Sequence, residues 1–122
     1  MEEPLLDPAL ADQVFSITSE AEIVDLRSMM REFETDLAPR FATLRAQGAA
    51  VAADPVESKR GLHGLRGVVA NFALARAAQQ LLLLETGWSG LSPGERSALL
   101  QRAEADVQGG LRALRQRFPY LV

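Results

Sequence analysis

Apolar residues recur at steps of three and four along most of the chain, which is the spacing of one face of an α-helix. The clearest run lies between residues 19 and 47 and consists of Ile23, Leu26, Met30, Phe33, Leu37, Phe41 and Leu44. A second run, near the C-terminus, consists of Leu100, Ala103, Val107, Leu111, Leu114 and Phe118. Alternation of apolar and polar residues, which is typical of strands, is nearly absent. The pattern therefore predicts an all-α protein.

Helix-start signals divide this pattern into separate helices. The three clear signals share an N-cap residue followed three positions later by glutamate: Ser19 with Glu22, Asp54 with Glu57, and Ser92 with Glu95. Proline also follows Asp54 and Ser92, at the first helical position, where it is well tolerated. Asp7 and Pro8 form a weaker start of the same kind.

These signals predict a short helix over about 7–17, followed by four longer helices joined by short connections. The longer helices are expected at about 19–47, 54–72, 74–86 and 92–118, with loops at 48–53 and 87–91. We expect Pro39 to kink the first of them without ending it, because the apolar stripe continues beyond it. We therefore predict one domain over 1–122, an antiparallel up-down four-helix bundle over about 19–118 preceded by a short extra helix.

Composition and charge exclude several classes of protein. The 122 residues include 13 Lys and Arg against 16 Asp and Glu, a net charge of -3, which disfavours non-specific nucleic-acid binding. The absence of cysteine excludes disulfides, thiolate metal sites and cysteine nucleophiles. The acidic N-terminus does not look like a secretory signal, and the longest aliphatic run, Leu81 to Leu84, is too short for a membrane span. We expect a cytoplasmic monomer with neither nucleic acid nor membrane as a partner.

The segment KRGLHGLRGVV, residues 59–69, holds the single histidine of the chain, His63. Placed at about 100° per residue, the apolar residues of this helix fall within an arc of about 120°: Leu62, Leu65, Val68, Val69 and Phe72. His63 points to the opposite side, together with Val56, Lys59, Arg60, Arg66, Gly67 and Ala70. The sequence therefore predicts an exposed imidazole flanked by cations.

Several roles for such a histidine are disfavoured by the rest of the sequence. No second histidine or cysteine is present to share a metal ion, and no serine stands in the context of a catalytic triad. An exposed nucleophilic imidazole that accepts a dianionic group fits better, because a neutral imidazole can form a covalent phosphoramidate. Arg66, one turn later, would pair with phosphoryl oxygens, and Gly67 would leave room for a partner. Gly61 is expected to serve helix packing, while Gly64 could serve either purpose.

The stretch LHGLRGVVANFALARAAQQLLLLE resembles the signature of histidine-containing phosphotransfer domains. The residues that match in type and spacing are His63, Leu65, Gly67, Asn71, Phe72, Leu84 and Glu85. The preceding MMREFETDLAPRFATLRAQG is similar to the acidic-aromatic lead-in helix of that family, so the resemblance spans about residues 19–118. Two positions depart from the family pattern: Arg66 replaces a lysine, and Ala73 replaces a glycine at the turn into the next helix.

The resemblance implies a phosphorelay intermediate rather than an enzyme with its own nucleotide site. His63 would take a phosphoryl group from a phosphoaspartate of one receiver domain and pass it to an aspartate of another. The expected partners are receiver domains of a hybrid histidine kinase and of response regulators; Mg²⁺ would be held by the receiver, and this chain would bind no cofactor. Arg66 would offset phosphoryl charge, and docking would involve Val56, Lys59, Arg60, Gly64, Gly67, Ala70 and Asn71.

Other interpretations of these residues stay open. Lys59 and Arg60 could be ordinary surface charges, and Asn71 could cap the end of its helix. The whole domain could be a non-catalytic adaptor that binds a receiver with His63 incidental. A helical dimerisation domain of a histidine kinase fits less well, because those often carry an acid directly after the histidine, where this chain has Gly64.

Overall fold

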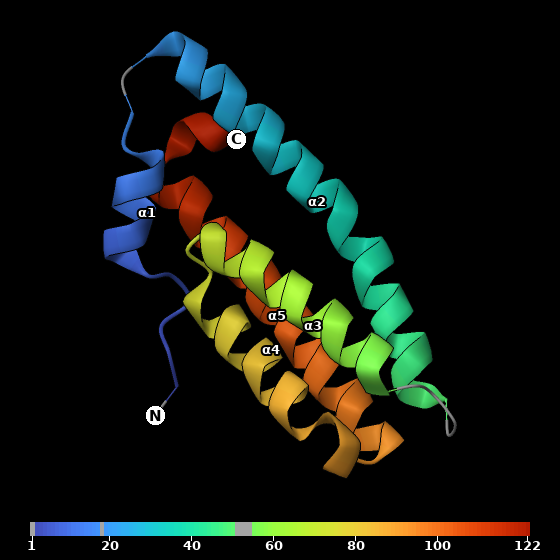
Figure 1. Cartoon of the computed structure of the whole chain (residues 1–122). Helices are drawn as coiled ribbons and strands as arrows, with labels where there is room; N and C mark the ends of the chain where they lie inside the picture. Colours follow the sequence, from blue (N-terminus) through green and yellow to red (C-terminus); the bar gives the residue numbers. More distant parts are fainter. Residues whose placement is uncertain (1, 18, 51–54) are drawn as a thin grey trace.

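The computed structural model describes residues 2–17, 19–50 and 55–122, and these residues form helices and no strands (Figure 1). The all-α prediction is therefore confirmed for the described part of the chain. The elements are α1 (Pro8–Phe15), α2 (Glu20–Ala49), α3 (Pro55–Asn71), α4 (Ala75–Gly87), the 3₁₀ turn η1 (Trp88–Gly90), α5 (Pro93–Arg117) and the 3₁₀ turn η2 (Pro119–Leu121). Within this described part, no helix is both long enough and apolar enough to cross a lipid bilayer.

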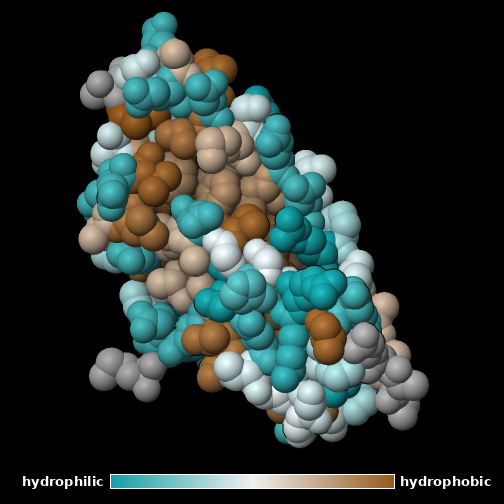
Figure 2. Space-filling model, in the orientation of Figure 1, coloured by the Kyte–Doolittle hydropathy of each residue, from teal (hydrophilic) through white to brown (hydrophobic). Residues whose placement is uncertain are grey.

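The four long helices lie alongside one another (Figure 1). α3 packs against α4, α4 packs against α5, and the longest helix, α2, packs against both α5 and α3. The first half of α2 extends past the end of α3, and α1 lies at the same end of the molecule (Figure 1). Figure 2 shows hydrophobic residues gathered in a hollow between α1 and this first half of α2, whereas hydrophilic residues dominate the other half of the same face.

Hydrogen bonds at the helix starts account for where the helices begin. Ser92 Oγ accepts from the Glu95 backbone N at 3.1 Å, and Glu95 Oε1 accepts from the Ser92 backbone N at 2.9 Å, a complete capping box. Hydrogen bonding from Ser92, first from its backbone N–H and then from its side chain, lowers the pKa of the Glu95 carboxyl. At the starts of α2 and α1, side-chain oxygens of Ser19 and Asp7 each accept one backbone N–H, without the reciprocal bond. The expected cap at Asp54 lies outside the described residues.

Both predicted loops contain helical residues, and a buried tryptophan explains why. Gly48 and Ala49 continue α2, because Gly48 is buried against Trp88, where an added Cβ would lie 3.2 Å from Trp88 Cη2. Gly87 likewise ends α4, and residues 88–90 form η1, which holds the Trp88 ring in the core. The Arg96 guanidinium donates to the Trp88 carbonyl from Nε at 3.0 Å and from Nη2 at 2.8 Å, and stacks 4.8 Å from the ring centroid. Burial of one aromatic ring overrides the local glycine signals. Residues 51–53 of the first loop are outside the described ranges.

A phenylalanine cluster fixes the end of the molecule where α1 lies. Phe33 of α2 stacks on Phe72 with ring centroids 4.2 Å apart and an interplanar angle of 12°. Phe15 of α1 contacts Phe72 at 6.2 Å and Phe118 at 5.7 Å. Aromatic pairs at these separations add to the area they bury, so the cluster ties α1, α2, α3 and the C-terminal turn together.

The turn between α3 and α4 is a Schellman motif with an alanine in the left-handed position. Ala73 has a φ of 62°, its N–H donates to Ala70 O at 3.0 Å, and the Leu74 N–H donates to Val69 O at 3.1 Å. Glycine would suit this conformation without steric cost. Ala73 is fully buried, so its methyl group contributes about 0.8 kcal/mol of burial, which partly offsets the left-handed cost of about 1–2 kcal/mol.

Glycines at two positions are expected to respond oppositely to the same substitution. A Cβ on Gly110 would lie 2.6 Å from Leu74 Cδ2, and Leu74 is fully buried, so Gly110→Ala should cost about 1–3 kcal/mol of unfolding free energy. A Cβ on Gly67 would meet nothing within 4 Å, so Gly67→Ala should stabilise the helix by up to about 1 kcal/mol. Urea unfolding followed by circular dichroism measures both, and equal stabilities of the two variants would contradict this packing.

Candidate functional site

His63 lies in the middle of α3 and projects from the side opposite the core. Leu62, Leu65 and Val69 are fully buried, whereas the His63 side chain is 69% exposed. The helical-wheel prediction of an exposed imidazole is therefore confirmed. Phe72 is also buried, and Val68 is only partly so.

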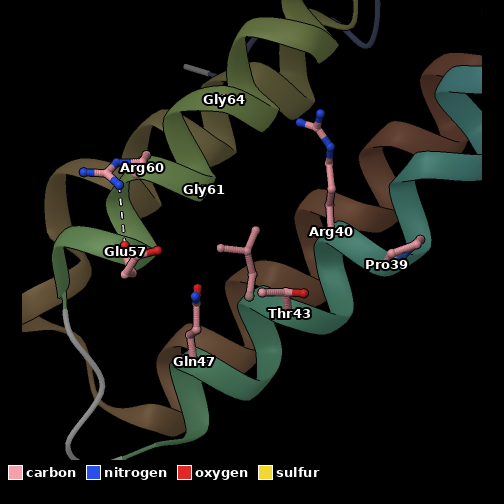
Figure 3. A pocket seen from close by; sticks show the side chains of 9 residues that line it. Pro39, Arg40, Thr43, Gln47, Glu57, Arg60, Gly61 and Gly64 are labelled. Atoms are coloured by element: carbon pink, nitrogen blue, oxygen red, sulfur yellow. Dashed lines mark hydrogen bonds and ion pairs between the residues drawn. The ribbon is translucent and has the colours of Figure 1, made fainter.

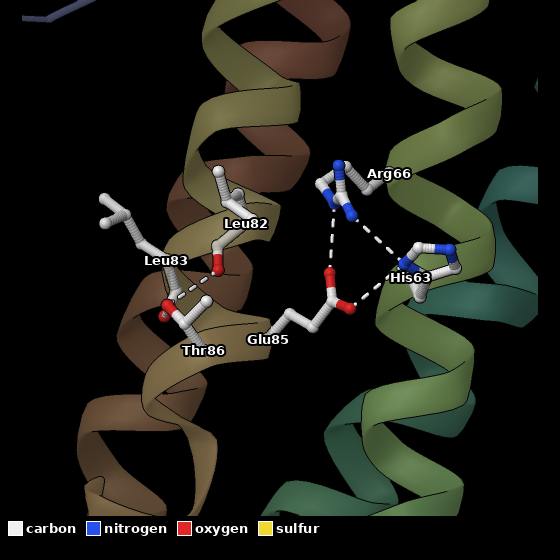
Figure 4. Close-up of polar contacts among 6 residues, drawn as sticks. All are labelled: His63, Arg66, Leu82, Leu83, Glu85 and Thr86. Carbon is white, nitrogen blue, oxygen red and sulfur yellow. Dashed lines mark hydrogen bonds and ion pairs between the residues drawn. The ribbon is translucent and has the colours of Figure 1, made fainter.

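Glu85 of α4 and Arg66 of α3 close a triangle with the imidazole (Figure 4). Glu85 Oε1 lies 3.0 Å from His63 Nδ1, and Glu85 Oε2 accepts from Arg66 Nε at 3.0 Å. Arg66 Nη2 also lies 3.0 Å from His63 Nδ1. The Arg66 and Glu85 side chains are 30% and 20% exposed, so this ion pair is partly shielded from water, unlike the imidazole.

These distances permit two arrangements of the imidazole proton. In the first, Nδ1 carries the proton and donates to Glu85, which leaves Nε2 with a free lone pair. In the second, Nδ1 accepts from Arg66, and the proton sits on Nε2. Nε2 forms no hydrogen bond with any residue in the described ranges. Only the first arrangement gives an unprotonated nitrogen that an incoming group can reach. In the second, the unprotonated nitrogen is Nδ1, which is enclosed between Arg66 and Glu85.

The other predicted cations, Lys59 and Arg60, are not part of the triangle. Arg60 Nη1 lies 3.5 Å from Glu57 Oε1 on the exposed surface of α3. The Lys59 side chain is half-buried and has no ion pair with a described residue. Exposed Val56 lies one turn nearer the start of the helix.

The three glycines of α3 have different surroundings. A Cβ on Gly61 would lie 3.3 Å from Leu44 Cδ2, so this position faces α2 and serves packing, as predicted. A Cβ on Gly64 or Gly67 would meet nothing within 4 Å, and both residues are exposed. Gly67, one turn after His63, leaves the space beside the imidazole open, whereas Gly64 borders a groove toward α2.

The remaining two residues of the predicted docking face lie at the end of α3. Ala70 is half-buried, and Asn71 is exposed as the last residue of the helix. The Asn71 side chain forms no hydrogen bond with the described residues, and the helix is closed by the backbone bonds around Ala73 instead. The cap interpretation of Asn71 therefore has no support, and its exposure leaves it available to a partner.

Sequence reasoning missed Glu85 as a member of this site. Glu85 matched the family signature, but its contact with His63 depends on how α3 and α4 align across the turn, which a wheel of one helix does not reveal. One signal was present, because Glu85 is the only acidic residue between positions 58 and 94. Among the described residues, no group of three or more metal-binding side chains is positioned to share an ion.

The proton arrangement at His63 is testable by long-range ¹H–¹⁵N correlation NMR in mildly alkaline buffer. We expect the proton mainly on Nδ1 in the wild type, because a carboxylate acceptor favours it. Glu85→Gln should shift the population toward the Nε2-protonated form, since the neutral amide is a weaker acceptor. Glu57→Gln, which alters an exposed glutamate on α3, serves as the control and should leave the spectrum of His63 unchanged. A wild type protonated mainly on Nε2 would contradict this assignment.

Comparisons of this chain with models of known families, with curated proteins and with solved structures found no match.

Proposed function

We propose that this protein is a phosphorelay intermediate of the histidine-containing phosphotransfer type, with His63 as the phosphoryl acceptor. The observation that carries the proposal is the exposed imidazole whose Nδ1 lies 3.0 Å from the Glu85 carboxylate while Nε2 faces solvent. A buried structural histidine would have both nitrogens enclosed, and an ordinary surface histidine needs no partly buried carboxylate and guanidinium on one of its nitrogens.

The proposed reaction begins with the Nε2 lone pair attacking the phosphorus of an acyl phosphate on a partner's aspartate. The new N–P bond forms as the bond from phosphorus to the carboxylate oxygen breaks, and the electron pair leaves with the partner's carboxylate. The proton on Nδ1 stays in place, so the ring gains positive charge, which the Glu85 carboxylate offsets. The reverse sequence delivers the phosphoryl group to a second aspartate. No proton has to leave the ring in either direction.

Arg66 is suited to stabilise the charge that arrives with the phosphoryl group. Its Nε is bonded to Glu85, whereas its Nη2, 3.0 Å from Nδ1, is left without an acceptor when Nδ1 carries the proton. That N–H can turn toward a phosphoryl oxygen while Nε keeps its contact with Glu85. The planar guanidinium thus serves two acceptors at once, which a lysine ammonium at this position would do less well.

The partners we propose are receiver domains of a hybrid histidine kinase and of response regulators, which would also hold the Mg²⁺. The hydrophobic hollow between α1 and the first half of α2 (Figure 2) supports a protein-binding role for this face, and partly buried apolar residues occur in α1, α2 and α3, namely Leu10, Val14, Leu26 and Val68. We further propose that α2 to α5 form an antiparallel up-down four-helix bundle and that the protein acts as a cytoplasmic monomer. The contacts of α3 with α4, of α4 with α5 and of α2 with both α3 and α5 support the bundle.

Phosphoryl transfer to His63 is the direct test. Incubation with phosphorylated receiver domains should place acid-labile, base-stable label on the wild type and none on His63→Gln. The exposed position of His63 means that this substitution should leave the fold unchanged, which circular dichroism checks. Label retained by the variant would overturn the proposal. Receivers that bind without ever labelling His63 would instead favour the non-catalytic adaptor.

Substitution of Arg66 separates charge from geometry. Arg66→Ala should slow transfer by a factor on the order of 100, as for loss of one donor to a developing charge. It should cost up to about 1 kcal/mol of stability, because the ion pair with Glu85 is only partly buried. Arg66→Lys should recover part of the rate, since it restores the charge without the fork. Single-turnover labelling measures these rates, and an Arg66→Ala rate equal to that of the wild type would remove Arg66 from the mechanism.

A further inference from the structure

A groove of about 440 Å³ lies between α2 and α3 (Figure 3). Arg40, Thr43 and Gln47 line it from α2, and Arg60, Gly61 and Gly64 line it from α3. Gly64 directly follows His63 in the chain, so the groove begins beside the proposed phosphoryl acceptor. This volume lies within the range of sites that hold a small molecule or a bulky side chain.

The two glycines of α3 make the groove. Nothing lies within 4 Å of a Cβ built on Gly64, so a larger side chain there would occupy the groove without disturbing the fold. Gly61 brings α3 close to Leu44, which forms part of an apolar floor. Glycine is a poor helix former, so two of them on one side of a 17-residue helix need a reason. An accessible groove supplies that reason for Gly64.

The polar groups of the groove are incompletely paired. Arg40 extends from α2 at the end of the groove nearer Gly64 (Figure 3), and its guanidinium has no hydrogen bond or ion pair with any described residue. Gln47 Oε1 is inaccessible to solvent and has no hydrogen-bond partner in the same set. Arg60 has Glu57 as its partner at 3.5 Å. The lining therefore carries one cation in excess, with an unsatisfied acceptor deeper inside.

We infer that this groove docks a segment of the partner receiver domain that presents an apolar side chain next to a carboxylate. The apolar side chain would lie on the floor between Leu44 and Gly64, and the carboxylate would pair with Arg40. The inference rests on the proposed phosphoryl transfer, because it is the partner's approach to His63 that brings this segment to the groove. Arg40 is thus a specificity-determining residue that does not touch the reacting atoms.

Two other occupants are less consistent with these residues. A second copy related by a two-fold axis through the groove would bring its own Arg40 toward the first, which places like charges together. A free small molecule would explain the unpaired groups, but it would not account for a groove that begins at the residue after His63. A partner that approaches His63 and carries a carboxylate accounts for the position of the groove and for the unpaired Arg40.

The test uses purified receiver domains, loaded by acetyl phosphate for transfer or by beryllofluoride for binding. Arg40→Glu should raise the KM for transfer by about tenfold and leave kcat unchanged, since a rim charge acts on association. The difference from wild type should shrink at high salt. Thr43→Trp, which fills the groove from α2, should have the same effect on KM.

Matched controls lie on the outer face of α2. Arg31 is about 180° around the helix from Arg40, and its side chain is likewise without an ion pair to the described residues. Thr35 is exposed on the same outer face, beside Arg31. Arg31→Glu and Thr35→Trp should therefore leave KM at the wild-type value. His63→Gln should abolish transfer and keep the wild-type affinity for the beryllofluoride-loaded receiver.

The possible outcomes distinguish failure of the groove proposal from failure of the proposed function. Normal transfer with Arg40→Glu and Arg31→Glu indistinguishable overturns the groove and leaves the phosphorelay function standing. Receiver binding that depends on Arg40 without labelling of His63 overturns the function and supports the groove. A protein that neither binds nor receives phosphate from any receiver overturns both. Arg40-dependent self-association, detected by ultracentrifugation, or tight binding of the small anionic probe benzoate would assign the groove to another occupant.

Discussion

The carboxylate of Glu85 is the group on which the proposed chemistry depends, because it links α4 to both polar side chains of α3. One oxygen lies 3.0 Å from His63 Nδ1 and the other accepts from Arg66 Nε, so a single anion orients the imidazole and holds the guanidinium. The anion is partly shielded while the imidazole is open to solvent. This difference lets one side of the ring be fixed by the protein and leaves the other side for a partner.

That contact requires α3 and α4 to align in one register, and the core on both sides of them enforces it. Leu74, at the start of α4, is fully buried against Gly110 of α5, where even a methyl group would not fit without rearrangement. At the other end of α4, Trp88 is held by Arg96 and lies against Gly48 of α2. The site therefore needs no loop of its own, since its geometry follows from helices clamped at both ends.

Local sequence determined much of this arrangement, and the parts it did not determine depend on contacts between helices. Caps at Asp7, Ser19 and Ser92 and the apolar stripes predicted the helices, and a wheel of one helix placed His63 on the exposed side. The helical ends around Gly48 and Gly87 were missed, because a buried Trp88 ring outweighs the local preference of glycine. Glu85 was not foreseen as a partner of His63 for the same reason, since its position relative to α3 is set by tertiary packing.

The left-handed Ala73 has a consequence for how this chain tolerates change. The turn at Ala73 is rigid. The Ala73 backbone is hydrogen-bonded to α3, its methyl group is in the core, and α4 starts two residues later. An insertion or deletion of one residue here would rotate every side chain of α4 by about 100° relative to α3. Glu85 would then leave His63 although both residues were still present. The length of this turn is thus constrained more tightly than its residue types, because the contact between His63 and Glu85 depends on their spacing of 22 residues.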